Sequence, residues 1–103
     1  MAQFDIYPNP GNRKVEIPYL VSVQNDHITS KTGATVVIPL RANAQAVDIM
    51  APLVEVATKG KFVLSTDEIF AIESARLKTP IAKLNIVDRA KIKPAIDKVI
   101  GEY

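Results

Sequence analysis

Histidine, serine and acidic side chains are the groups from which a catalytic or metal site would be built, and this chain offers few of them. His27 is the only histidine. Its nearest acid, Asp26, is the adjacent residue, which is an awkward spacing for chelating one ion. A serine–histidine–acid triad would need the same His27, and no serine lies in a nucleophile-elbow sequence. We interpret His27 as a surface residue of a loop.

Other common site types are also missing from the sequence. The chain has no cysteine, and therefore no thiolate for metal binding or nucleophilic attack. Its four glycines are not clustered, so there is no glycine-rich phosphate loop. The adjacent acids Asp67 and Glu68 follow a serine and a threonine, a pattern more typical of a turn than of an acid–base pair. We expect no metal, no cofactor and no catalytic residue.

The charged residues indicate a solvated surface. Thirteen Lys and Arg against eleven Asp and Glu give a net charge of +2, which is too small to indicate nucleic-acid binding by itself. No aromatic residue interleaves with the basic residues near the C-terminus, as a platform for single-stranded nucleic acid would require. We interpret that stretch as a solvated helix face. Its basic residues are Arg76, Lys78, Lys83, Arg89, Lys91, Lys93 and Lys98.

The length and the absence of long apolar runs predict one soluble domain. The chain of 103 residues is expected to be a single domain covering 1–103. Its start lacks the charged and apolar regions of a secretory signal. No apolar run approaches the roughly 20 residues that a membrane helix needs. We expect a cytoplasmic protein with no membrane contact.

Two apolar runs around Ile17 to Leu40 are expected to form the central strands. The first, Val15 to Val23, alternates with a period of two, as a half-buried strand does. The second, Thr35 to Leu40, is apolar on both faces, so we expect both of its faces to be covered. The residues predicted to share one face of the first strand are Val15, Ile17, Tyr19, Val21 and Val23.

Shorter strands are expected on either side of this centre. The clearest pair is a hairpin in which Gly60 supplies the residue that tolerates a positive φ. Arg41 to Met50 is ambiguous, because one or two helical turns would also fit it. The predicted strands are Gln3 to Tyr7, Leu53 to Ala57, Lys61 to Ser65 and Ile69 to Ile72.

The last element is predicted to be a helix capped by Asn85, with Asp88 reaching back to the cap backbone. Pro94 conflicts with a continuous helix, so the helix either kinks there or starts anew nearby. Gly101 can end it. One apolar stripe follows from the 3.6-residue period, and we interpret it as core or dimer packing. It consists of Ile92, Ile96, Val99 and Ile100.

Five segments together resemble the CcdB family of toxin–antitoxin toxins. The most specific pair is VQND at residues 23–26 and VIPL at residues 37–40, at this spacing and this distance from the start. The resemblance extends over nearly the whole chain. The segments are QFDIY at 3–7, YLVSVQND at 19–26, GATVVIPL at 33–40, LSTD at 64–67, and Arg89, Ile92, Ala95 and Ile96 of the final helix.

This resemblance implies a mostly β fold with a C-terminal helix, an SH3-like barrel whose five-stranded sheet is accompanied by a small second sheet. It implies a homodimeric toxin that is not an enzyme and uses no cofactor. CcdB-like toxins bind the DNA gyrase A subunit and trap the gyrase–cleaved DNA complex. A cognate CcdA-like antitoxin neutralises them, and the toxin–antitoxin complex binds operator DNA and represses its own transcription.

The resemblance also implies where the partners bind. The gyrase-contacting residues would be the helix end and tail, and Ile92 and Ile96 would serve dimer or antitoxin packing. This chain departs from the family at that point. The gyrase poisons of the family end in Trp-Gly-Ile, and this chain has no tryptophan. The corresponding residues here are Val99, Ile100, Gly101, Glu102 and Tyr103.

Two alternatives stay open. The first is a ribonuclease like the related MazF toxins, which share the fold and cut RNA with arginines and small polar residues. Arg13, Arg41 and Arg76 are the arginines that such a site would recruit. The second is a non-toxic CcdB homologue that retains antitoxin binding and has lost its target.

Overall fold

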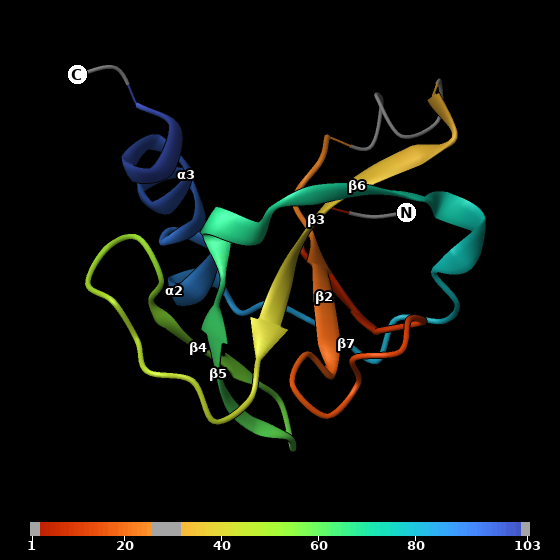
Figure 1. Cartoon of the computed structure of the whole chain (residues 1–103), viewed down its shortest axis with the longest axis horizontal. Coiled ribbons are helices and arrows are strands. Elements are labelled where there is room, and N and C mark those ends of the chain that lie inside the picture. The colour runs from red at the N-terminus through yellow and green to blue at the C-terminus, as the bar shows by residue number, and fades with distance from the viewer. Residues whose placement is uncertain (1–2, 26–31, 102–103) are drawn as a thin grey trace.

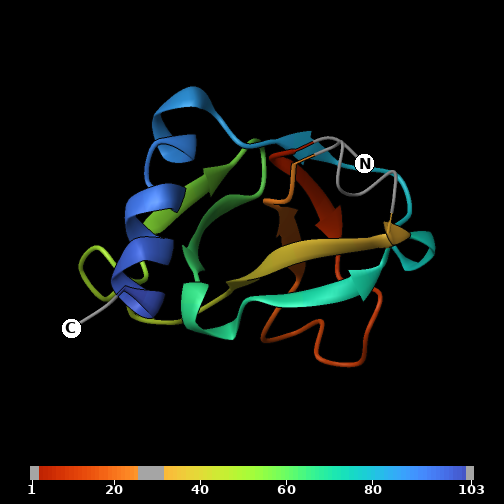
Figure 2. The ribbon, with the colours of Figure 1, turned by 90° about the horizontal axis from the view of Figure 1, so that it is seen from above.

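The computed structural model describes residues 3–25 and 32–101, and its strands form one antiparallel sheet. This sheet curls into a nearly closed barrel with α3 against one side (Figures 1 and 2). The strand order is β4-β5-β3-β2-β1-β7, and β6 pairs with β3. The predicted mostly β, barrel-like fold with a C-terminal helix is confirmed. The strands are β1 (Asp5–Pro8), β2 (Tyr19–Ser22), β3 (Ala34–Arg41), β4 (Leu53–Val56), β5 (Gly60–Leu64), β6 (Phe70–Glu73) and β7 (Ala82–Lys83).

Strand β3 is the centre of the sheet, as its apolar sequence predicts. It pairs with β2 along one edge, and along the other with β6 near its start and β5 near its end. The smaller sheet expected beside the main one is therefore continuous with it through β3. The predicted hairpin is also confirmed, since β4 pairs with β5 across a turn in which Thr58 and Gly60 have positive φ angles of 65° and 108°.

Side chains alternate between two apolar clusters on opposite faces of the sheet. Ile6 and Tyr7 are adjacent in β1 and enter different clusters, as the predicted alternation requires. Ile38 and Val37 do the same in β3, so both faces of this strand are covered as predicted. The larger cluster also takes in residues of the hairpin and of α3.

The predicted strand from Val15 to Val23 is wrong in its first half. The strand begins only at Tyr19. Before it, the N–H of Ile17 donates to the carbonyl of Arg13 in a tight turn, and Val15 is 88% exposed. Ile17 consequently packs with Leu20 on the face opposite to Val21. Pro18 has no N–H for a ladder bond, so the period of two does not continue through it.

The C-terminal helical segment consists of two helices, α2 (Ile86–Arg89) and α3 (Ile92–Ile100). Of the two alternatives for Pro94, a second helix that starts nearby is therefore correct, and a kinked continuous helix is wrong. Pro94 is the third residue of α3, where a backbone N–H has no partner within the helix. Two 3₁₀ turns, η1 (Thr66–Glu68) and η2 (Ser74–Arg76), flank β6.

The cap of α2 is confirmed, but the reach-back of Asp88 differs from the prediction. The side-chain oxygen of Asn85 accepts the N–H of Asp88 at 2.8 Å. The carboxylate of Asp88 accepts from the side-chain amide of Asn85 and from the N–H of Glu55 in β4. It thus joins α2 to the sheet instead of closing the helix cap on itself.

The ambiguous segment 41–50 contains no helix. It runs through positive φ angles at Asn43 (57°) and Asp48 (42°) and ends in a bridge between Val47 and Ala51. In the part of the chain that the structure describes, no helix has both the length and the apolar character needed to cross a membrane.

Candidate functional site

The apolar stripe of α3 changes from buried to exposed along the helix. Ile92 is 5% exposed and belongs to the larger core cluster, which Ile96 joins only in part. Val99 is half-buried, and Ile100 is 70% exposed. Ile92 therefore packs in the core of its own chain. The side chain of Ile100 is exposed and available for an apolar contact with a partner. The proposed contact residues Glu102 and Tyr103 lie outside the described residues.

Gly101 ends α3, as predicted, but for a reason that the sequence does not contain. Its φ of −65° and ψ of 156° are extended values that any residue can adopt. The space around it is the constraint, because a Cβ at this position would overlap the carbonyl oxygen of Asp97. Glycine therefore lets the backbone at this position pass close to the last turn of α3.

A hollow of about 330 Å³ lies beside α3, and Ile96 lines it. The guanidinium of Arg89 lies 5.4 Å from the centre of the Phe4 ring and donates through Nε to the carbonyl of Leu84 at 2.6 Å. Lys93 lines the same hollow. The described part of α3 therefore offers a partner an apolar surface with cations beside it.

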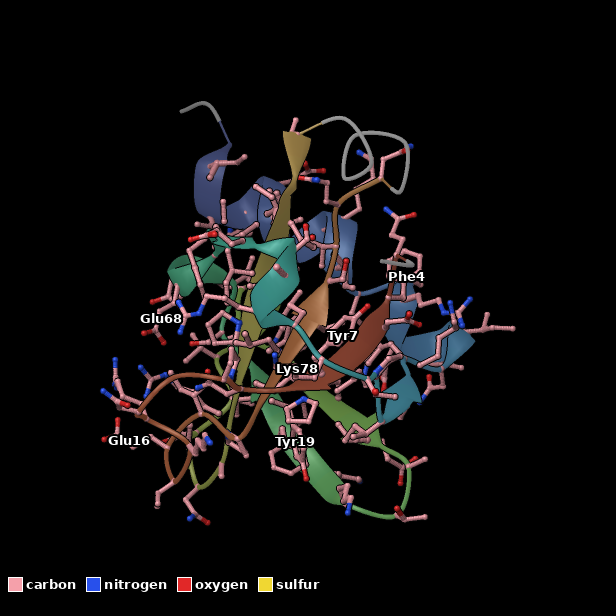
Figure 3. The ribbon with its side chains drawn as sticks, turned by 90° about the vertical axis from the view of Figure 1, so that its right-hand side faces the viewer. Phe4, Tyr7, Glu16, Tyr19, Glu68 and Lys78 are labelled. Atoms are coloured by element: carbon pink, nitrogen blue, oxygen red, sulfur yellow. The ribbon has the colours of Figure 1, made fainter. Side chains whose placement is uncertain are left out.

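Arginines gather on a different side of the molecule, near Glu16 and Glu68 (Figure 3). Arg41 binds both carboxylate oxygens of Glu68, with Nη2 at 2.6 Å from Oε2. Arg13 pairs with Glu16 at 2.7 Å. Figure 3 places Phe4 on the opposite edge from these acids. Arg41 thus anchors one end of β3 to η1.

Two of the arginines meet at a second hollow. Arg13 and Arg76 line a space of about 300 Å³ together with Glu68. Its walls include apolar residues of the smaller cluster and the exposed ring of Phe70. The arginines named for a ribonuclease therefore do come together, although Arg41 reaches the hollow only through its partner Glu68.

The electrostatics of this cluster favour binding over proton transfer. The hydrogen bonds from Arg41 lower the pKa of Glu68 from 4.5 to about 2, and the Ser65 hydroxyl adds to the effect. The same pairing raises the pKa of Arg41. A carboxylate this acidic is a poor general base near neutral pH. Asp67 and Glu68 lie in η1, which confirms them as turn residues, but the ion pair of Glu68 was not predicted.

Three of the seven basic residues near the C-terminus form ion pairs. Lys83 pairs with Asp5 at 3.2 Å, Lys91 with Asp88 at 2.8 Å and Lys93 with Asp97 at 3.4 Å. These contacts agree with a solvated surface. Among residues 3–25 and 32–101, no group of three potential ligands could hold a metal ion, and His27 lies outside these ranges.

Comparisons with known proteins give a family and a fold. A family model described as CcdB protein matches residues 3–101. No curated protein matches the chain. Among solved structures, an endoribonuclease in complex with its cognate antitoxin, from a mycobacterial species, matches with a TM-score of 0.83. The match covers 100% of this chain and 97% of that chain at 13% identity, a level at which the likeness concerns the fold alone.

Proposed function

The chain belongs to the CcdB family, and from this membership we propose that it is the toxin of a type II toxin–antitoxin pair. Its target would be the DNA gyrase A subunit, which it would bind so that the gyrase–cleaved DNA complex is trapped. A cognate antitoxin would neutralise it. The observation that carries the proposal is the family match over nearly the whole chain.

The surface proposed for gyrase is the end of α3 with the tail that follows it. Ile100 supports this choice, because a 70% exposed isoleucine on the last helical turn adds nothing to the chain's own core. The family's tryptophan is absent, so the aromatic anchor would have to be Tyr103. A large aromatic side chain supplies much contact area at small entropic loss.

The experiment is a cleavage assay with purified gyrase and supercoiled DNA. Linear DNA released by detergent and protease is the expected product, and Tyr103→Ala should abolish it. Tyr19→Phe is the matched control, since it changes a tyrosine of β2 and leaves the tail intact. Absence of linear DNA with a properly folded protein would contradict the gyrase proposal and leave the ribonuclease and the non-toxic homologue, which an RNA-cleavage assay separates.

A ribonuclease is the second candidate, because Arg13 and Arg76 line one hollow with an exposed aromatic ring. Against it stands the low pKa of Glu68, which disfavours this carboxylate as the base that would activate a ribose hydroxyl. Incubation with RNA distinguishes the two candidates. Cleavage that is lost in Arg76→Ala and retained in Lys78→Ala, at an exposed cation nearby in sequence, would favour the ribonuclease.

A further inference from the structure

A larger groove, of about 690 Å³, lies beside α2. Figure 1 shows α2 at the end of α3 that is remote from the chain terminus. The edge strand β4 lines one side, and Lys83 of the edge strand β7 lines the other. The buried side chains of Val54 and Leu84 lie beneath it. The residues that line this groove do not include Val99, Ile100 or Gly101 of the surface proposed for gyrase.

Two backbone groups on the outer edge of β4 are occupied from within the chain. The carboxylate of Asp88 accepts the N–H of Glu55 at 2.8 Å, and Lys91 donates to the carbonyl of Leu53 at 2.9 Å. Lys91 and Asp88 also pair with each other at 2.8 Å. Edge groups that are already bonded are poor templates for adding a strand. We therefore expect recognition in the groove to depend mainly on side chains.

Its apolar side chains are exposed. Ile86 and Val87, adjacent in the single turn of α2, are 78% and 73% exposed. Leu53 of β4 lines the same groove and is 44% exposed. None of the three belongs to either core cluster. Contiguous exposed apolar residues rimmed by charged ones are typical of an interaction site.

The exposed charges around this apolar patch are mainly positive. The basic residues that line the groove are Lys61, Lys83, Arg89 and Lys91. Lys83 also pairs with Asp5, and Lys91 with Asp88. Of the two acids that line the groove, Asp88 has a side chain that is only 7% exposed, which leaves Glu55 as the exposed one. We propose that the groove binds an acidic amphipathic segment of a partner protein. The apolar side chains of that segment would cover Ile86 and Val87, and its carboxylates would face the lysines.

The same observations disfavour other occupants. A second copy bound through the same face would bring lysines against lysines, since a two-fold interface repeats one surface. Single-stranded nucleic acid would need aromatic stacking partners, and the residues that line the groove include none. The inference stands whether or not gyrase is the target, because it uses no residue of the C-terminal tail.

The test is a binding measurement with a designed acidic peptide. The peptide carries leucines three and four positions apart and glutamates on its other face, and its binding is followed by NMR shifts and fluorescence anisotropy. Val87→Glu is expected to weaken binding about tenfold, because it places a carboxylate at the centre of the contact. Val15→Glu is the matched control, at an exposed valine outside the groove, and should change binding less than about twofold.

Two further arms test the chemistry. A peptide with glutamine in place of glutamate should bind more weakly, and raising the salt concentration should weaken the acidic peptide alone. A scrambled peptide of the same composition should lose most of its affinity. The proposal is overturned by equal binding to both valine variants, by no saturable shift up to about 1 mM peptide, by competition from single-stranded DNA, or by a change of oligomeric state in Val87→Glu alone.

Discussion

The two ends of α3 carry the same side chain in opposite surroundings. Ile92 in the first turn is 5% exposed, and Ile100 in the last turn is 70% exposed. Both lie on one apolar stripe of the sequence. The difference shows that periodicity identifies the face of a helix, whereas the extent of the barrel core decides how much of that face is buried.

Asp88 and Asp97 differ in the same way, because one is buried and the other is exposed. Asp88, before α3, has a side chain that is 7% exposed and binds groups of Asn85, Lys91 and Glu55. Asp97, near the helix end, has a 64% exposed side chain and a single ion pair with Lys93 at 3.4 Å. The start of the helical region is thus fixed to the sheet, whereas Asp97 and Ile100 near its end are exposed to solvent.

The largest change in stability that tests this comparison is expected when the buried Ile92 is replaced. Ile92→Ala should lower the free energy of unfolding by about 3 kcal/mol, because it removes apolar contacts and leaves a cavity in the larger cluster. Ile100→Ala is the same change at the exposed end and should stay within about 0.5 kcal/mol of the wild type. Urea unfolding measures both. Equal losses would mean that Ile100 is buried in the folded protein.

A smaller effect is expected from the two aspartates. Asp88→Ala should lower the free energy of unfolding by about 2 kcal/mol, since the N–H of Glu55 and the ammonium of Lys91 lose their partner. Asp97→Ala should change it by less than about 0.5 kcal/mol, as removal of an exposed ion pair does. Denaturant titrations at pH 7 check both. If Asp88→Ala were as mild as Asp97→Ala, α2 would not depend on this carboxylate for its attachment.

These two pairs also show what the sequence could and could not predict. The β3 strand, the hairpin and the Asn85 cap follow from local signals, such as a doubly apolar run, a glycine in a turn and an amide before a helix. The sequence pattern did not predict that Ile17 and Val21 lie on opposite faces, because the turn at Arg13 interrupts the strand alternation. Contacts between distant segments also lacked a local signal, as for Arg41 with Glu68 and Asp88 with Glu55.

Acid is expected to lower the stability of the folded protein through Glu68 and Asp88. The folded-state pKa of Glu68 is about 2, below its ordinary value of 4.5, and η1, which contains Glu68, contacts α3. The pKa of Asp88 is also lowered: burial opposes the shift, but the hydrogen bonds from Lys91 and from the N–H of Glu55 outweigh it. Groups with depressed folded-state pKa values stabilise the fold above their unfolded pKa and lose that contribution as the pH falls.

The free energy of unfolding should therefore be level above about pH 5 and fall as the pH decreases from 4.5 toward 2. Glu68→Gln should remove about 1 kcal/mol of that fall, a figure reduced for solvent screening of a partly exposed pair. Urea midpoints across this pH range measure it. Glu73→Gln, at an exposed glutamate of β6, serves as the control and should follow the wild-type curve. A Glu68→Gln curve as steep as the wild type would contradict the role of the Arg41 pair.

The smallest change in stability with a functional consequence is expected at Gly101. Gly101→Ala places a Cβ against the carbonyl of Asp97, so the chain must leave α3 in a different direction. The free energy of unfolding should fall by less than about 1 kcal/mol, because a terminal turn can fray to relieve the overlap. Trapping of the gyrase–cleaved DNA complex should nevertheless decrease, since the proposed contacts follow this residue. Gly11→Ala is the matched control, because there the Cβ would meet only the side-chain oxygen of Asn9, at 3.3 Å. If Gly101→Ala trapped gyrase as well as Gly11→Ala does, the exit direction of the tail would not matter, and the contact surface would have to be sought on the body of α3.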